Sequence, residues 1–256
     1  MAKIKVLILR GPGTNCDVET AFAFELVGAQ VDSAHINEVV RRGKFLSGYQ
    51  ILAIPGGFTY GDDISAGKIL ANEVRLKLAD EVGKFIAEGK LVLGICNGFQ
   101  VMVKAGILPH LHDSSRHCLT LAPNDSGKFE CRWVYLRVNE ESPCIFTKGI
   151  RSMYLPVAHA EGKVVIEPEM RENLNVVLWY ADERGNIEAG YPHNPNGSFG
   201  NIAGICDESG RLFALLPHPE RHIQGIHHPR WTRDKLKGYG DGFQIFLNAV
   251  KWVEGI

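Results

Sequence analysis

The stretch LVLGICNGFQ (91–100) contains the residue best suited to covalent chemistry, a cysteine flanked by two glycines. Gly94, Cys96 and Gly98 form G-x-C-x-G, the thiol counterpart of the G-x-S-x-G elbow, in which a sharp strand-to-helix turn exposes the central side chain. At a helix start, the helix dipole and free N–H groups favour the thiolate. The alternative is a small core residue at the end of a strand, because free cysteines are often buried. The paired glycines favour a nucleophile.

A histidine and a glutamate in LPHPER (216–221) could serve this nucleophile. Prolines follow Leu216 and His218 and push both residues into extended conformations. In an extended chain, residues i and i+2 share a face, with Cα atoms ~6.6 Å apart. Glu220 could therefore orient one nitrogen of His218 while the other nitrogen faces Cys96, as in a catalytic triad. The alternative is a surface loop with solvated side chains.

Backbone N–H groups near these residues could stabilise an oxyanion. The turn Pro55-Gly56-Gly57 ends an apolar run, and the N–H of Gly57, paired with that of Asn97, could form an oxyanion hole. The alternative for the Pro-Gly-Gly turn is a tight connection without chemistry. Gln100 lies one helical turn after Cys96, so its amide could bind substrate in the same pocket.

Other cysteines and histidines offer competing chemistry. Cys16 follows the first apolar run near a helix start and is a rival nucleophile by position, but it lacks flanking glycines. The histidines His218 and His222 lie four residues apart, yet Pro219 argues against a metal-binding helix. A second group matches no standard zinc spacing; it consists of His110, His112, His117 and Cys118. We therefore expect no metal site.

The apolar pattern predicts the strands and helices that must position these residues. Near-continuous apolar runs predict strands at 3–9, 30–36, 50–54 and 91–96, with helices over 18–26, 65–88 and after Cys96. Alternating strands and helices indicate a parallel sheet covered on both faces. Shorter runs in the second half predict antiparallel strands and a final amphipathic helix; they lie at 128–138, 152–159, 163–168, 175–181, 202–207, 212–217 and 240–256. The predicted fold class is α/β, with a mostly parallel central sheet and a smaller antiparallel sheet.

The composition bounds the organisation of the chain. Its 256 residues are 45% hydrophobic and 22% charged, an ordinary globular balance. We expect one continuous domain over 1–256, with a possible insertion at 222–242. A net charge of -1 gives no electrostatic case for nucleic acid or an anionic membrane, and no apolar run is long enough to span a bilayer. The start lacks the pattern of a signal peptide. Six scattered cysteines without a CxxC pair predict free thiols in the cytoplasm.

Six motifs, taken in order, resemble a class I (triad) glutamine amidotransferase. They are GGFTYGDD (56–63), GICNGFQ (94–100), GKFECRW (127–133), LPVAHAEG (155–162), NPNGS (194–198) and LPHPER (216–221). The resemblance covers nearly the whole chain and implies a flavodoxin-like core. The forms GICNGFQ, GGFTYGD and PHPER are most similar to the branch of the family that serves de novo purine biosynthesis.

The resemblance implies a glutaminase that acts with a synthetase. Cys96 would attack the glutamine amide and form a glutamyl thioester, while His218 transfers protons and Glu220 orients it. The ammonia would pass to a large ATP-dependent synthetase subunit that converts formylglycinamide ribonucleotide to formylglycinamidine ribonucleotide, and a small accessory subunit is also expected. No cofactor is expected in this chain, which has no GxxxxGK[ST] motif; ATP and magnesium are expected in the partner.

Three stretches depart from the family pattern. Ala160 stands where the family usually has the glycine of His-Gly-Glu, and His159 could be structural or could support the site. Residues 110–126 and 222–242 are longer and more polar than in compact relatives. Within the second stretch, Trp231 could contact a partner or simply cover the surface.

Other functions stay open on the sequence alone. One is a class I amidotransferase subunit serving a different synthetase. Another is a thiol hydrolase or quality-control protein of the same architecture, which would be expected to lack the PHPE segment. A regulatory protein that only binds would be expected to have lost Cys96 or His218.

Overall fold

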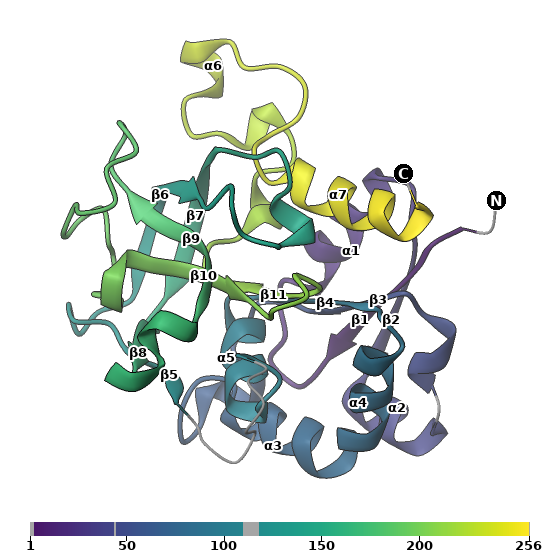
Figure 1. Ribbon diagram of the computed structural model, residues 1–256. Helices are drawn as coiled ribbons and strands as arrows, with labels where there is room; N and C mark the ends of the chain where they lie inside the picture. Colours follow the sequence, from purple (N-terminus) through teal and green to yellow (C-terminus); the bar gives the residue numbers. More distant parts are fainter. Residues whose placement is uncertain (1–2, 44, 110–117, 256) are drawn as a thin grey trace.

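A nine-stranded sheet runs through the whole molecule, in a computed structural model that describes residues 3–43, 45–109 and 118–255. Helices cover both faces of the part of the sheet that the first half of the chain builds (Figure 1). The strand order is β2-β1-β3-β4-β11-β10-β9-β6-β7. The continuous sheet agrees with the expectation of one domain over 1–256, which stays a prediction.

Five neighbouring strands form the parallel part of this sheet. The strands are β2 (Gln30–His35), β1 (Lys5–Arg10), β3 (Ile51–Ile54), β4 (Leu91–Ile95) and β11 (Leu212–Leu215). Four of them confirm the strands predicted in the first half of the sequence, and β11 joins them from the far end of the chain. The apolar runs of β1, β3, β4 and β11 are buried on both faces because helices cover both sides, whereas β2 at the edge is only partly buried.

The remaining strands are antiparallel, and most of them extend the main sheet. They are β10 (Ile202–Cys206), β9 (Asn175–Ala181), β6 (Glu130–Val138) and β7 (Ser152–His159). A separate two-stranded antiparallel sheet pairs β5 (Leu119–Pro123) with β8 (Glu161–Ile166). The α/β class with a small added antiparallel sheet is confirmed.

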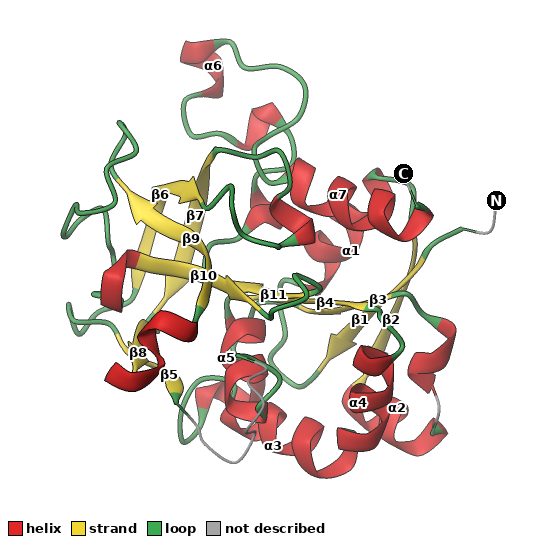
Figure 2. Ribbon diagram, viewed as in Figure 1, coloured by secondary structure: helices red, strands yellow, loops and turns green. Residues whose placement is uncertain are grey.

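Helices form a layer on each side of the parallel strands (Figure 2). One core cluster lies under α1 (Asp17–Leu26) and α7 (Phe243–Glu254). The other core cluster lies under four helices, which are α2 (Ile36–Arg42), α3 (Lys68–Lys77), α4 (Ala79–Ala87) and α5 (Asn97–Ala105). The single helix predicted over 65–88 is thus two helices, because the backbone turns out of helical geometry at Leu78.

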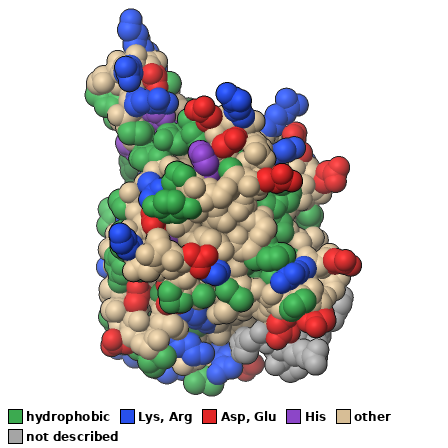
Figure 3. Space-filling model, turned by 90° about the vertical axis from the view of Figure 1, so that its left-hand side faces the viewer, with side chains coloured by type: hydrophobic (Ala, Val, Ile, Leu, Met, Phe, Trp, Pro, Cys, Tyr) green, Lys and Arg blue, Asp and Glu red, His purple; other side chains and the backbone are tan. Residues whose placement is uncertain are grey.

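The two polar stretches singled out in the sequence differ in structure. Residues 110–117 lie outside the described residues, and the apolar pattern did not predict that 119–123 would form β5. Part of 222–242 projects from the body with the short helix α6 (Trp231–Asp234) (Figure 1), whereas His222, Ile223 and His228 of the same segment are buried. Figure 3 shows Lys and Arg side chains gathered on this projection; the exposed basic residues of the segment are Arg230, Arg233, Lys235 and Lys237. Whether it is a family-specific insertion stays a prediction.

Candidate active site

Loops from four parallel strands meet at one edge of the sheet. These loops follow β1, β3, β4 and β11, and they carry Cys16, Gly57, Cys96 and His218. All four strands run in the same direction, so their carboxyl ends lie together, where open α/β sheets bind ligands. The topology therefore brings residues that are far apart in sequence into one site.

Cys96 occupies a strained turn between β4 and α5. Its φ of 51° and ψ of -104° are unusual for a residue with a side chain. Close packing holds this turn, because a Cβ on Gly98 would lie 1.9 Å from the carbonyl oxygen of Ile54. Cys96 is buried, and its Sγ lies 3.7 Å from the carbonyl oxygen of Ala158. This is the geometry of a nucleophile elbow, which agrees with the interpretation of G-x-C-x-G.

His218 and Glu220 form a buried hydrogen-bonded pair. The Nδ1 of His218 lies 2.6 Å from Oε1 of Glu220, and both side chains are almost fully enclosed. Burial works against a charged imidazole, but the negative charges of Glu220 and Cys96 raise the pKa of His218 well above its usual value. The Nε2 of His218 has no hydrogen-bond partner among the described residues, so this nitrogen is the one left to serve Cys96.

The predicted oxyanion-hole residues lie beside this pair. A Cβ on Gly56 would lie 2.8 Å from the His218 ring, so the Pro-Gly-Gly turn packs directly against the imidazole. Gly57 has a φ of +148° and is packed against residues 13–15. Asn97 is the first residue of α5, so its N–H has no acceptor within the helix. The oxyanion-hole roles of Gly57 and Asn97 stay predictions.

The side chains of Asn97 and Gln100 belong to a buried hydrogen-bond network. Asn97 Oδ1 accepts from the Thr59 hydroxyl at 2.6 Å, and its Nδ2 donates to Gln100 Oε1 at 2.9 Å. Gln100 Nε2 donates in turn to the carbonyl oxygen of Glu161. The Glu161 carboxylate binds Lys104 on α5 at 2.6 Å. This network ties α5 to the β7–β8 connection; a direct contact of Gln100 with substrate stays a prediction.

His159 is buried next to the site at the end of β7. Its Nδ1 lies 3.1 Å from Asn124 Oδ1, and its Nε2 has no partner among the described residues. Burial, together with the nearby charge of His218, lowers the pKa of His159 to about 3. His159 is therefore neutral at physiological pH, and its contact with Asn124 favours the structural role over a proton-transfer role.

Cys16, which the sequence offered as a rival nucleophile by position, contacts His218, and the sequence analysis did not anticipate this contact. Its buried Sγ lies 3.9 Å from Nδ1 of His218, on the imidazole nitrogen that binds Glu220. Burial raises the pKa of Cys16 to about 11, so the thiol stays protonated. It is therefore poorly suited to be the rival nucleophile. Its place in the loop between β1 and α1, beyond the carboxyl end of a parallel strand, is a signal that could have indicated membership of the site.

A metal site is disfavoured by the contacts around these residues. Cys16, His218 and Glu220 have potential ligand atoms within 4.8 Å of one another. However, the Arg221 guanidinium lies 3.1 Å from Cys16 Sγ and would repel a cation. His222 instead binds the carbonyl oxygen of Tyr154 through Nδ1 at 2.8 Å. The histidines His110, His112 and His117 lie outside the described residues.

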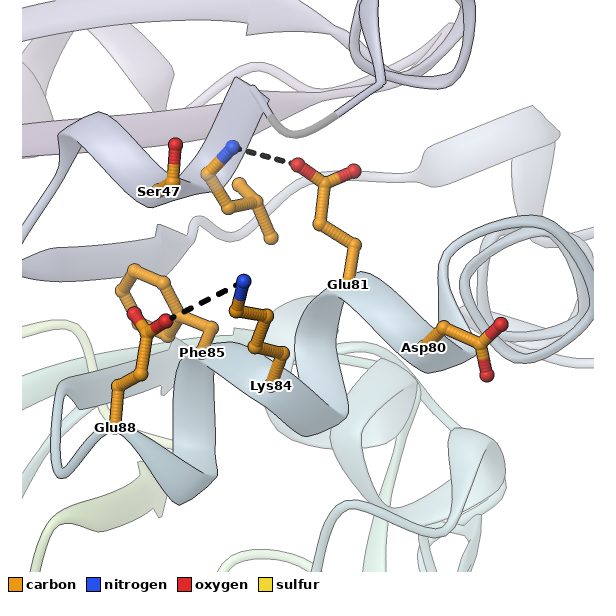
Figure 4. A pocket seen from close by; sticks show the side chains of 7 residues that line it. Ser47, Asp80, Glu81, Lys84, Phe85 and Glu88 are labelled. Carbon is orange, nitrogen blue, oxygen red and sulfur yellow. Dashed lines mark hydrogen bonds and ion pairs between the residues drawn. The ribbon is translucent and has the colours of Figure 1, made fainter.

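A separate cavity does not overlap with this site. It has a volume of about 410 Å³ and lies against α4, where Lys84 points toward Glu88 at 3.9 Å (Figure 4). Glu81 accepts a hydrogen bond from the N–H of Leu46 at 2.7 Å. The cavity shares no residue with the Cys96 site, so we assign it no part in the chemistry.

Comparison with known proteins decides the family. A family model described as "CobB/CobQ-like glutamine amidotransferase domain" matches residues 3–253. The chain belongs to this glutamine amidotransferase family. The amidotransferase is 54% identical over 257 residues to "Phosphoribosylformylglycinamidine synthase subunit PurQ" of Dehalococcoides mccartyi, with 100% of both chains covered. It is 43% identical to the protein of the same name from Methanococcus maripaludis, with 97% of each chain covered.

A solved structure supports the same relationship. The amidotransferase resembles a chain in "Structure of PurLQS from Thermotoga maritima" with a TM-score of 0.76 and 31% sequence identity. The match covers 98% of this chain and 100% of that chain. The resemblance to class I glutamine amidotransferases drawn from the six motifs is confirmed, and so is its purine-biosynthesis branch. In the described residues, no helix is both long enough and apolar enough to cross a membrane.

Proposed function

We propose that this chain is the glutaminase subunit of a phosphoribosylformylglycinamidine synthase. It hydrolyses glutamine to glutamate and ammonia, and it supplies the ammonia for converting formylglycinamide ribonucleotide to formylglycinamidine ribonucleotide. The observation that carries the chemistry is the buried His218–Glu220 pair beside a cysteine held in a nucleophile elbow. The full-length identity of 54% to a synthase subunit supports the choice of this synthase over another.

In the first half-reaction, the Cys96 sulfur attacks the side-chain carbonyl carbon of glutamine. The protonated imidazole of His218 accompanies the Cys96 thiolate, because the pKa of His218 is raised by Glu220 and Cys96. The tetrahedral oxyanion accepts hydrogen bonds from the N–H groups of Asn97 and Gly57. As the carbon–nitrogen bond breaks, His218 donates its Nε2 proton to the leaving nitrogen. The products are ammonia and a glutamyl thioester on Cys96.

In the second half-reaction, neutral His218 takes a proton from water. The resulting hydroxide adds to the thioester carbonyl, and the carbon–sulfur bond breaks to release glutamate. Cys96 leaves as the thiolate beside the imidazolium, which restores the starting state. Glu220 holds Nδ1 throughout, so the imidazole presents Nε2 to Cys96 and stabilises the positive charge on the ring.

Delivery of the ammonia requires a partner. Ammonia released into water at neutral pH is mostly protonated, and ammonium has no lone pair with which to attack. The names of the relatives describe a synthase subunit, and the matched Thermotoga chain comes from a structure titled PurLQS. We propose a large synthetase subunit and a small accessory subunit as partners, with ATP and magnesium bound by the synthetase.

The free thiols support a proposal for the cellular location. The described residues include six cysteines, all of them free, and five of these are buried. Free cysteines persist in reducing compartments. We therefore propose that the protein works in the cytoplasm.

The test measures glutamine hydrolysis with and without the large and small synthase subunits. We expect weak activity alone, strong stimulation by the partners, and loss of glutaminase activity in Cys96→Ala. The same variant, assembled with its partners, should still make formylglycinamidine ribonucleotide when ammonium chloride replaces glutamine. Retained glutaminase activity in Cys96→Ala would contradict the mechanism. Equal stimulation by an unrelated synthetase would contradict the purine assignment.

A further inference from the structure

We propose that Cys16 is a positioning residue for His218: its thiol supports the imidazole on the Nδ1 side and fixes the proton-transfer geometry at Cys96. The proposal rests on the function assigned to His218 above. It goes beyond that function because a second cysteine, on another loop, becomes part of the machinery without touching the substrate.

The first support is the packing around the imidazole. Cys16 Sγ lies 3.9 Å from Nδ1 of His218, and Glu220 Oε1 lies 2.6 Å from the same nitrogen. Gly56 packs against both side chains, because a Cβ there would lie 2.8 Å from the His218 ring and 3.0 Å from Cys16 Sγ. Glu220 and Cys16 therefore both lie against Nδ1 of the imidazole, and the Gly56 backbone packs against its Cε1 edge.

The second support is the way Cys16 itself is held. Its thiol donates to Asn15 Oδ1 at 3.1 Å, and its sulfur accepts from Nη2 of Arg221 at 3.1 Å. Arg221 in turn binds Glu19 on α1 at 2.7 Å. Cys16 also precedes α1 directly, and its carbonyl oxygen accepts from the Thr20 hydroxyl at 2.6 Å. The sulfur is thus held by Asn15 and by Arg221, and Arg221 is itself held by Glu19 on α1.

These contacts determine what the sulfur can do chemically. Because the thiol proton is committed to Asn15, the sulfur faces His218 as a hydrogen-bond acceptor. An acceptor near Nδ1 favours the protonated imidazole, and this contact contributes to the raised pKa of His218. Since the Cys16 thiol stays neutral, it adds no second negative charge beside the Glu220 carboxylate. A sulfur is also a weak acceptor, so it leaves Glu220 as the main partner of Nδ1.

The experiment compares Cys16→Ala, Cys16→Ser and Cys206→Ala with the wild-type chain. Cys206→Ala is the matched control, because Cys206 is as deeply buried as Cys16 but lies on β10, away from the triad. Glutaminase activity of the assembled synthase gives kcat, KM and their pH profile. Alkylation of Cys96 by iodoacetamide in the isolated chain, followed by peptide mass spectrometry, gives a readout that needs neither glutamine nor partner.

The expected effect of Cys16→Ala is a loss of about fivefold in kcat, with KM for glutamine within twofold, because one weak hydrogen bond is removed. Loss of that acceptor lowers the pKa of His218, so the alkaline limb of the kcat/KM profile moves to lower pH. The rate of Cys96 alkylation at neutral pH falls by a similar factor, because a less basic His218 stabilises less thiolate. Cys16→Ser, which restores a donor and an acceptor, recovers most of both rates.

The outcomes separate this proposal from the proposed function. If Cys16→Ala and Cys206→Ala lose stability equally and leave the pH profile and the alkylation rate unchanged, Cys16 is only a packing residue and the proposal is wrong. Should Cys16→Ala fail to fold, Cys16→Val decides, because valine fills the space of the thiol but accepts no hydrogen bond. The proposal predicts the same losses as for Cys16→Ala, whereas a purely structural role predicts wild-type pH behaviour. If the wild-type chain shows no Cys96-dependent glutaminase activity, the proposed function itself fails, whatever the alkylation of Cys96 shows.

Discussion

Replacing Glu220 by glutamine tests the triad most directly, because it removes one charge and almost no volume. Glu220 Oε1 accepts from Nδ1 of His218 at 2.6 Å, and both groups are almost fully buried. A hydrogen bond to a charged partner contributes ~1.5–3 kcal/mol and a neutral one ~0.5–1.5 kcal/mol. If the amide oxygen keeps the bond, the lost difference of about 1–2 kcal/mol slows kcat roughly 5- to 30-fold.

A second effect makes the loss larger. Glu220 Oε2 has no hydrogen-bond partner among the described residues, so an amide NH₂ at that place would be a buried, unsatisfied donor, which costs about 1–3 kcal/mol. The glutamine can avoid this cost by turning its NH₂ toward Nδ1 of His218. The neutral ring would then carry its proton on Nε2, which is the nitrogen that must accept a proton during catalysis. In serine-protease triads a comparable reversal costs about 10⁴-fold in kcat, so we expect Glu220→Gln to lie between ~10-fold and ~10⁴-fold.

The assay measures kcat and KM for glutamine in the assembled synthase from pH 6 to pH 9.5. Because Glu220 touches His218 and not the substrate, KM should stay within about threefold. The pKa of His218 should fall, which moves the alkaline limb of kcat/KM to lower pH. The control is Glu38→Gln, which makes the same chemical change in an ion pair with Arg42 on α2 and should leave both constants unchanged. A rise in KM at constant kcat would refute the orienting role of Glu220.

Two further predictions concern folding. Gly98→Ala should strongly destabilise the fold, since its Cβ would lie 1.9 Å from the carbonyl oxygen of Ile54. The control Gly83→Ala, with open space inside α4, should stabilise the fold by ~0.5–1 kcal/mol. Equal melting temperatures of the two variants would contradict the packing argument. His159 has a pKa of about 3 in the folded state and an ordinary value of 6.5, so the unfolded chain binds more protons between these values. Stability should fall by ~1.4 kcal/mol per unit as the pH drops below 6.5, and a urea titration of His159→Gln should lack this slope; an identical slope in both proteins would show that other groups cause it.

The sequence was most informative where function depends on a local backbone pattern. The G-x-C-x-G motif predicted the turn at Cys96, and the turn forms because glycines at 94 and 98 allow a close approach that any Cβ would block. The LPHPER stretch predicted that His218 and Glu220 pair, and the 2.6 Å hydrogen bond agrees with this. The backbone differs from the prediction, because of the two residues only His218 is extended, while Pro219–Arg221 form a short 3-10 helix. Apolar runs predicted the parallel strands, because a strand covered on both faces carries apolar side chains on both.

The spatial arrangement of segments that are far apart in the sequence was harder to predict. The pattern over 65–88 is amphipathic throughout, and only packing on the sheet shows that it breaks at Leu78 into two helices. The later apolar runs predicted antiparallel strands, but their order decides that β10, β9, β6 and β7 continue the main sheet while β5 and β8 pair apart from it. That order depends on contacts between segments far apart along the chain.

The contrast is sharpest at the two cysteines of the site. The sequence indicated the strained turn at Cys96 and the pairing of His218 with Glu220. Tertiary structure alone decided that Cys16, 202 residues before His218, lies against the same imidazole nitrogen as Glu220. The physical reason is that a turn's conformation is set by its own residues, whereas the neighbours of a buried ring are set by which strand ends the sheet brings together.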